Sequence, residues 1–139
     1  INGLHGRWEV IHEHPTVVMD VGHNEDGVKQ IVAQLNESSY NKLHIVIGMV
    51  KDKEIEKVLA LLPKDAHFYF TKAHIPRALP EADLHAKALA FDLNGDTFEH
   101  VNAAIASAMQ QATKDDLILV CGSVFLVGEV DVEAIGNRQ

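Results

Sequence analysis

Residues 44–50 read HIVIGMV, an apolar run in which polar and apolar residues do not alternate. A strand with one face in water alternates, whereas a strand covered by helices on both faces does not. Two further runs have the same character, HFYFT at residues 67–71 and LILVC at residues 117–121, and a shorter one, TVVM, stands at residues 16–19. The sequence therefore predicts several buried strands of one sheet.

Between these runs lie segments whose apolar residues recur every three or four positions, the spacing of one helix face. They are residues 28–35, 54–62, 84–89 (after Pro80) and 98–108. Residues 90–93 read as a further short strand, and the apolar residues 124–127 as the start of a helix. Strands joined through helices need crossover connections. We therefore predict an α/β fold, a three-layer Rossmann-like domain with a mostly parallel sheet and helices on both faces.

The length and charge of the chain limit what it can bind. Its 139 residues are enough for one domain with a core of its own. The 20 acidic and 12 basic residues give a net charge of −8 with histidine neutral. This charge argues against nucleic acid and anionic membranes as partners, because both are bound through clustered cations. No apolar run approaches the roughly 20 residues that a membrane-spanning helix needs.

The amino-terminal segment and the single cysteine indicate the context of the domain. Residues 1–14 are polar and contain glycine, so we expect an interdomain tether there and a folded domain over residues 15–139. The chain does not begin with Met, which fits an excised piece of a longer protein. Because Cys121 stands alone, no internal disulfide can form, and a reducing cytoplasm is the expected location.

Polar residues follow the predicted strands, where ligands of parallel sheets bind. After the first strand, DVGHN at residues 20–24 supplies the carboxylate of Asp20, the imidazole of His23 and the amide of Asn24. Asn24 alone is equally well explained as the cap of the next helix. Gly122 and Ser123 follow the last strand and can present N–H groups and a hydroxyl to an anion, or simply cap a helix.

Two cations follow the middle strands, and both also fit a solvated surface. Lys51 comes after the second strand and Arg77 after the third. We expect Asp20 and Ser123 to face one cleft as exposed side chains, because their strands are predicted to be neighbours. The histidines near the amino terminus match no zinc spacing, so no metal site is expected. The sequence also contains no nucleophile elbow, dinucleotide loop or phosphate loop.

Five motifs in order resemble one known family. They are GRWEV at residues 6–10, DVGHN at 20–24, KDK at 51–53, PRA at 76–78 and GSVFLVGE at 122–129. They resemble the C-terminal domain of folylpolyglutamate synthase/dihydrofolate synthase, in the Mur ligase superfamily, over about residues 3–130. The resemblance implies a Mur ligase-type glutamate-ligase domain of a bifunctional, ATP-dependent, ADP-forming enzyme. Such an enzyme adds L-glutamate to a pteroate or folate carboxylate through an acyl phosphate.

The resemblance also implies roles for individual residues. ATP binding falls on Arg7 and Asp20, and glutamate binding on His23 and Ser123. Further cleft residues are Asn24, Lys51, Arg77 and Gly122. The family's phosphate loop and magnesium ligands lie in a larger N-terminal region, so ATP and Mg²⁺ are the expected cofactors. An N-terminal ATPase domain of the same chain is an expected partner, together with folate or dihydropteroate and L-glutamate. These 139 residues then hold no catalytic residue and should be inactive alone.

Two other functions stay open. A Mur-type peptidoglycan precursor ligase shares the fold and the acyl-phosphate chemistry, although the ending GSVFLVGE favours the folate branch. A non-catalytic Rossmann-like binding module would explain why the sequence has no phosphate loop.

Overall fold

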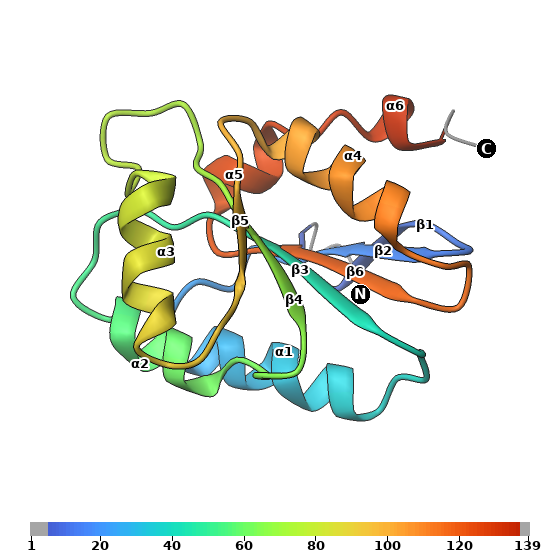
Figure 1. The fold of residues 1–139 in the computed structure, drawn as a ribbon, viewed down its shortest axis with the longest axis horizontal. Coiled ribbons are helices and arrows are strands. Elements are labelled where there is room, and N and C mark those ends of the chain that lie inside the picture. The colour runs from blue at the N-terminus through green and yellow to red at the C-terminus, as the bar shows by residue number, and fades with distance from the viewer. Residues whose placement is uncertain (1–5, 137–139) are drawn as a thin grey trace.

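In the computed structural model, which describes residues 6–136, six strands form one sheet in the order β1-β2-β6-β3-β4-β5 (Figure 1). The strands are β1 (Glu9–His12), β2 (Thr16–Met19), β3 (Leu43–Ile47), β4 (His67–Phe70), β5 (Gly95–Thr97) and β6 (Leu117–Cys121). Neighbouring strands run parallel, except that β1 pairs antiparallel with β2. The predicted mostly parallel sheet is confirmed.

Helices cover both faces of this sheet (Figure 1). They are α1 (Glu25–Asn36), α2 (Ile55–Leu61), α3 (Glu81–Leu89), α4 (Val101–Gln111), α5 (Val124–Gly128) and α6 (Val132–Gly136). Buried side chains of α1, α2 and α3 share one apolar cluster with the sheet, and those of α4, α5 and α6 share another. Strand residues alternate between the clusters, as Val17 and Val18 do. This is the predicted three-layer fold. Within residues 6–136, no helix has the length and apolar character to cross a membrane.

The prediction of a strand at residues 90–93 was wrong. This segment is a turn after α3, in which Asp92 has a φ of 62° that a strand cannot continue. The strand lies later, at β5, whose Gly95, Asp96 and Thr97 carry no apolar signal because β5 is the exposed edge of the sheet. Gly95 is required there, since a Cβ atom would collide with the carbonyl group of Phe68.

Two other boundaries differ from the prediction. β3 ends at Ile47, and Met49 is buried because residues 49–51 pair with residues 77–79. Within the predicted tether, residues 9–12 form β1 and belong to the sheet, while residues 1–5 lie outside the described part of the chain. The side chains of an edge strand are only partly buried, so β1 can contain polar residues, and its sequence looked like that of a linker. A linking role for residues 1–14 stays a prediction.

Candidate ligand-binding cleft

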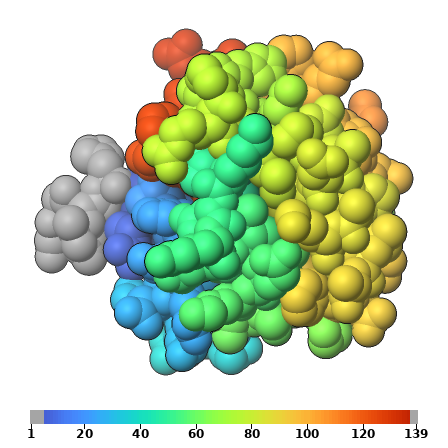
Figure 2. All heavy atoms as spheres, turned by 90° about the vertical axis from the view of Figure 1, so that its left-hand side faces the viewer, coloured from blue at the N-terminus to red at the C-terminus, as the bar shows by residue number. Residues whose placement is uncertain are grey.

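Asp20 and Ser123 stand at the ends of neighbouring parallel strands, as predicted. Met19 of β2 lies opposite Val120 of β6, and the backbone N–H of Asp20 donates to the carbonyl of Val120 over 2.9 Å. Figure 2 shows the side of the molecule near these strand ends, where the loop after β4 (light green) lies beside α5 (red-orange). The segments that carry the candidate residues therefore gather at the carboxyl ends of the parallel strands.

A cavity of about 150 Å³ lies at these strand ends and is called the Ser123 cleft below. Its walls are formed by His23, Val50, Asp52, Arg77, Gly122, Ser123, Val124 and Phe125. Four of the predicted residues, from three separate loops, thus come together. Besides the carboxylate of Asp52, which accepts from the backbone N–H of Glu54, this small cleft offers one imidazole, one guanidinium and one hydroxyl, which suit an anionic group of a small ligand.

Ser123 fills one of the two roles that its sequence position offered, the helix cap, and it also lines the cleft. It is the N-cap of α5, and its Oγ accepts a hydrogen bond of 3.0 Å from the backbone N–H of Phe125. The hydroxyl can still donate its own hydrogen to a ligand. Gly122 has a φ of 114°, and a Cβ atom there would collide with the carbonyl of Gly48. Glycine is therefore required for the turn that brings Ser123 to the cleft.

Asp20 does not line the Ser123 cleft. Its Oδ2 accepts from the backbone N–H of Trp8 over 2.9 Å, and its Oδ1 from that of Gly22 over 2.8 Å. The residue is 4% exposed, as is Ser123, so the expectation of exposed side chains was wrong for both. The sequence could not show that Asp20 is buried, because one of its hydrogen-bond donors, the N–H of Trp8, belongs to a segment that only the fold brings next to it. The Asp20 carboxylate fastens residues 7–8 to the turn after β2.

Arg7 lies against Asp20, so the structure brings the two predicted ATP-binding residues together. Its Nε is 3.6 Å from Asp20 Oδ1, and its Nη2 donates to Gln30 Oε1 over 2.6 Å. Nε is buried and has no hydrogen-bond partner among residues 6–136. The Arg7 side chain is 38% exposed, so the rest of its guanidinium is accessible and is a candidate for a ligand oxygen.

Two predicted residues remain, Asn24 and Lys51. Asn24 caps α1, its Oδ1 accepting from the N–H of Gly27 over 2.8 Å, and Lys51 is exposed; neither lines the cleft.

Sequence reasoning missed the apolar rim of the cleft, where Val124 is 53% and Phe125 47% exposed. The signal was available, since a five-residue helix beside a cleft cannot bury four successive apolar residues.

Neither thiol nor metal chemistry is evident in the described residues. Burial raises the pKa of the Cys121 thiol far above its usual range, with the nearby Asp20 adding to the effect, so it is no nucleophile. Within residues 6–136, no three His, Cys, Asp or Glu side chains are grouped as a metal ion would need.

The chain is similar to known ligases over most of its length. Residues 6–124 match the family model for the Mur ligase, glutamate ligase domain. A protein of Haloferax volcanii named "Probable bifunctional folylpolyglutamate synthase/dihydropteroate synthase" is 38% identical over 128 residues, which are 89% of this chain and 15% of that protein.

Two solved structures share the fold. Escherichia coli FolC in complex with DHPP and ADP is 30% identical, has a TM-score of 0.83, and is matched over 96% of this chain and 31% of its own. A bifunctional folylpolyglutamate synthase/dihydrofolate synthase with Mn, AMPPNP and L-glutamate bound is 29% identical, with a TM-score of 0.81 and the same coverage. This chain thus spans a third or less of these proteins. Because the family model covers most of its residues, the chain belongs to the Mur ligase family of glutamate ligase domains.

Proposed function

We propose that this chain is the glutamate-ligase domain of a bifunctional folylpolyglutamate synthase/dihydrofolate synthase. The whole enzyme is ATP-dependent and ADP-forming and joins L-glutamate to the carboxylate of dihydropteroate or a folate. The observation that carries the proposal is the Ser123 cleft, which gathers His23, Arg77 and Ser123 at the carboxyl ends of the strands. The family match and the ligands named for the two solved structures support it.

In this function the domain binds and orients the amino acid. ATP transfers its γ-phosphoryl group to the acceptor carboxylate, the glutamate nitrogen attacks the acyl carbon, and inorganic phosphate leaves while the nitrogen loses its proton. The guanidinium of Arg77 and the hydroxyl of Ser123 suit the glutamate carboxylates, and His23 lies at the same cleft. Holding the nitrogen beside the activated carbonyl removes much of the entropic barrier to attack.

ATP and Mg²⁺ are the proposed cofactors. The guanidinium of Arg7, whose side chain is 38% exposed, fits a ribose or phosphate oxygen, and Asp20, which lies 3.6 Å from its Nε, is an acceptor for a hydroxyl. The magnesium ligands belong, in this proposal, to the N-terminal ATPase domain, where the family resemblance puts them. The 139 residues alone are then inactive. The lone Cys121 fits a reducing compartment such as the cytoplasm.

A ligase assay tests this function and its rivals. The protein that contains this domain and its N-terminal region is supplied with ATP, Mg²⁺, L-glutamate and one acceptor at a time. ADP release with dihydropteroate or tetrahydrofolate is the expected result. Release only with a nucleotide-linked muramoyl peptide would favour the peptidoglycan branch. No release with any acceptor would favour a binding module, and turnover by the 139-residue chain alone would contradict the division of roles.

A further inference from the structure

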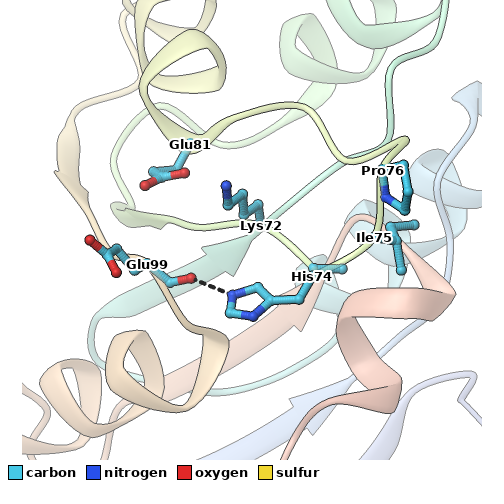
Figure 3. A pocket seen from close by; sticks show the side chains of 7 residues that line it. Lys72, His74, Ile75, Pro76, Glu81 and Glu99 are labelled. Atoms are coloured by element: carbon cyan, nitrogen blue, oxygen red, sulfur yellow. Dashed lines mark hydrogen bonds between the residues drawn. The ribbon is translucent and has the colours of Figure 1, made fainter.

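A second and larger cavity, of about 560 Å³, is lined mainly by residues 72–76, which directly precede Arg77 of the Ser123 cleft (Figure 3). It is called the Lys72 pocket and is lined by Lys72, Ala73, His74, Ile75, Pro76, Glu81 and Glu99. The walls come from the loop after β4, the first residue of α3 and the loop before α4. Roughly 300–1,000 Å³ is the usual size of a pocket for a small molecule, and the ends of parallel strands are its usual place.

The Lys72 pocket carries charges of both signs that the protein leaves unpaired. In Figure 3 the side chains of Lys72, Glu81 and Glu99 lie in the same part of the pocket, with Glu81 nearer to the Lys72 ammonium group in this view than Glu99. Among residues 6–136, none of these three charged groups makes a hydrogen bond or an ion pair within 4.0 Å. Lys72 and Glu81 are half-buried, so their charges are less screened than those of exposed side chains. A ligand can pair with them without first breaking an internal ion pair.

His74 fixes one wall of the pocket. Its backbone N–H donates to Glu129 Oε2 over 2.7 Å, and its Nε2 donates to the carbonyl of Glu99 over 2.9 Å. Its ring also packs against His100, with ring centroids 4.4 Å apart. With Nε2 carrying the hydrogen, Nδ1 of the neutral ring is an acceptor. The loop after β4 is thereby held to α5 and to the loop before α4.

We propose that the Lys72 pocket binds a free α-amino acid as its zwitterion, with the carboxylate on Lys72 and the ammonium group on Glu81 and Glu99. A dicarboxylate without an amine meets two like charges, and a diamine meets the lysine, so only a ligand with both signs satisfies all three groups. The identification with L-glutamate rests on the proposed function, because glutamate is the amino acid that the ligase consumes. The pocket is then a second glutamate site, separate from the Ser123 cleft.

Titration of the ¹⁵N-labelled 139-residue chain by NMR tests the pocket. L-glutamate should give saturable shifts at the amides of Lys72, Ala73, Glu81 and Glu99. Glutarate, which has the same carbon skeleton without the amine, should bind at least tenfold more weakly. Shifts confined to residues of the Ser123 cleft, or equal affinities for glutamate and glutarate, would overturn the proposal.

Variants separate the charges from the shape of the pocket. Lys72→Ala should weaken glutamate binding about tenfold, whereas Lys57→Ala, which removes an exposed lysine of α2 outside the pocket, should change nothing. The isosteric double variant Glu81→Gln/Glu99→Gln should weaken glutamate binding and strengthen glutarate binding. A purely structural role would not reverse this preference, and the double variant keeps the test decisive if Lys72→Ala misfolds.

The proposal and the ligase function can fail separately. Ser123→Ala should leave the titration at the Lys72 pocket unchanged, because Ser123 does not line it. If the longer protein releases no ADP in response to glutamate, the function fails, and the titration still decides the pocket. If the ligase is active while the titration shows no saturation at the pocket, only the second glutamate site is refuted.

Discussion

The two ends of the parallel strands differ in how their polar side chains are paired. Where the strands begin, His44 is buried and hydrogen-bonded to Tyr69 and to Asp116, which are also buried. Where the strands end, the side chains of Lys72 and Arg77 have no partner among residues 6–136. The distances where the strands begin are 2.8 Å from Tyr69 Oη to His44 Nδ1 and 2.9 Å from His44 Nε2 to Asp116 Oδ2. Buried polar groups that satisfy one another stabilise a fold, while unpaired charges at strand ends remain available to a ligand.

The protonation states in this network follow from its surroundings. Burial alone would raise the pKa of Asp116, but hydrogen bonds from His44, Thr113 and Lys42 outweigh it and lower the pKa to about 2. Burial, with Asp96 and Asp116 nearby, raises the pKa of Tyr69 to about 12. The carboxylate is therefore charged and the phenol keeps its proton. Because the charged carboxylate can only accept, His44 Nε2 donates to Asp116, while His44 Nδ1 and the Tyr69 hydroxyl share the second hydrogen bond.

The largest effect should come from breaking this network. Asp116→Ala leaves the N–H groups of Lys42 and Thr113 and the ring of His44 without their acceptor. Removing one partner of a buried ion pair or network costs about 3–5 kcal/mol. Arg77→Ala at the other ends of the strands should cost less than about 0.5 kcal/mol, as exposed substitutions do. Urea unfolding of both variants measures this, and equal losses would remove the distinction between the two ends.

The next effect concerns Asp20, which lies where the strands end but, like Asp116 where they begin, is buried and accepts hydrogen bonds within the protein. Asp20→Ala removes the acceptor of two backbone N–H groups, those of Trp8 and Gly22. Because the acceptor is charged and buried, we expect a loss of about 2–3 kcal/mol in the free energy of unfolding. In the longer protein the variant should also raise the KM for ATP. A raised KM with unchanged stability would show that the carboxylate serves the ligand and not the fold.

The pH dependence of stability gives a third test. The pKa of Asp116 is lowered from its usual 3.8 to about 2 on folding, so its stabilising effect is complete above about pH 4 and is lost as the pH falls toward 2. The shift corresponds to about 2 kcal/mol. Thermal unfolding between pH 2 and pH 6 should therefore show a steeper loss for the wild type than for Asp116→Asn. Parallel curves would mean that another carboxyl group dominates acid unfolding.

The parts of the fold that burial alone specifies were predictable. A strand covered on both faces must be apolar throughout, which identified β3, β4 and β6. Edge strands carry no such requirement, so β1 and β5 escaped detection.

The same division applies to the site. The rule that ligands bind where parallel strands end selected His23, Arg77 and Ser123 in the sequence, and the structure has all three in one cleft. Lys72, Glu81 and Glu99 were not predicted as a group, because only the packing of α3 and the loop before α4 brings them together. Side chains that directly follow the parallel strands can therefore be predicted from the sequence to lie together, whereas side chains brought together by helix packing cannot.

The smallest effect compares two helix caps that only the cleft distinguishes. Ser123 caps α5 and lines the Ser123 cleft, whereas Asn24 caps α1 and does not line it. Loss of an N-cap side chain costs about 1 kcal/mol, so Ser123→Ala and Asn24→Ala should lower stability by similar amounts. Only Ser123→Ala should raise the KM for glutamate in the longer protein, by about tenfold, because a hydrogen bond to a charged ligand is lost with it. Asn24→Ala is the control for the loss of stability that both variants share. A raised KM for glutamate in both variants would therefore mean that glutamate binding does not depend on the Ser123 hydroxyl in particular.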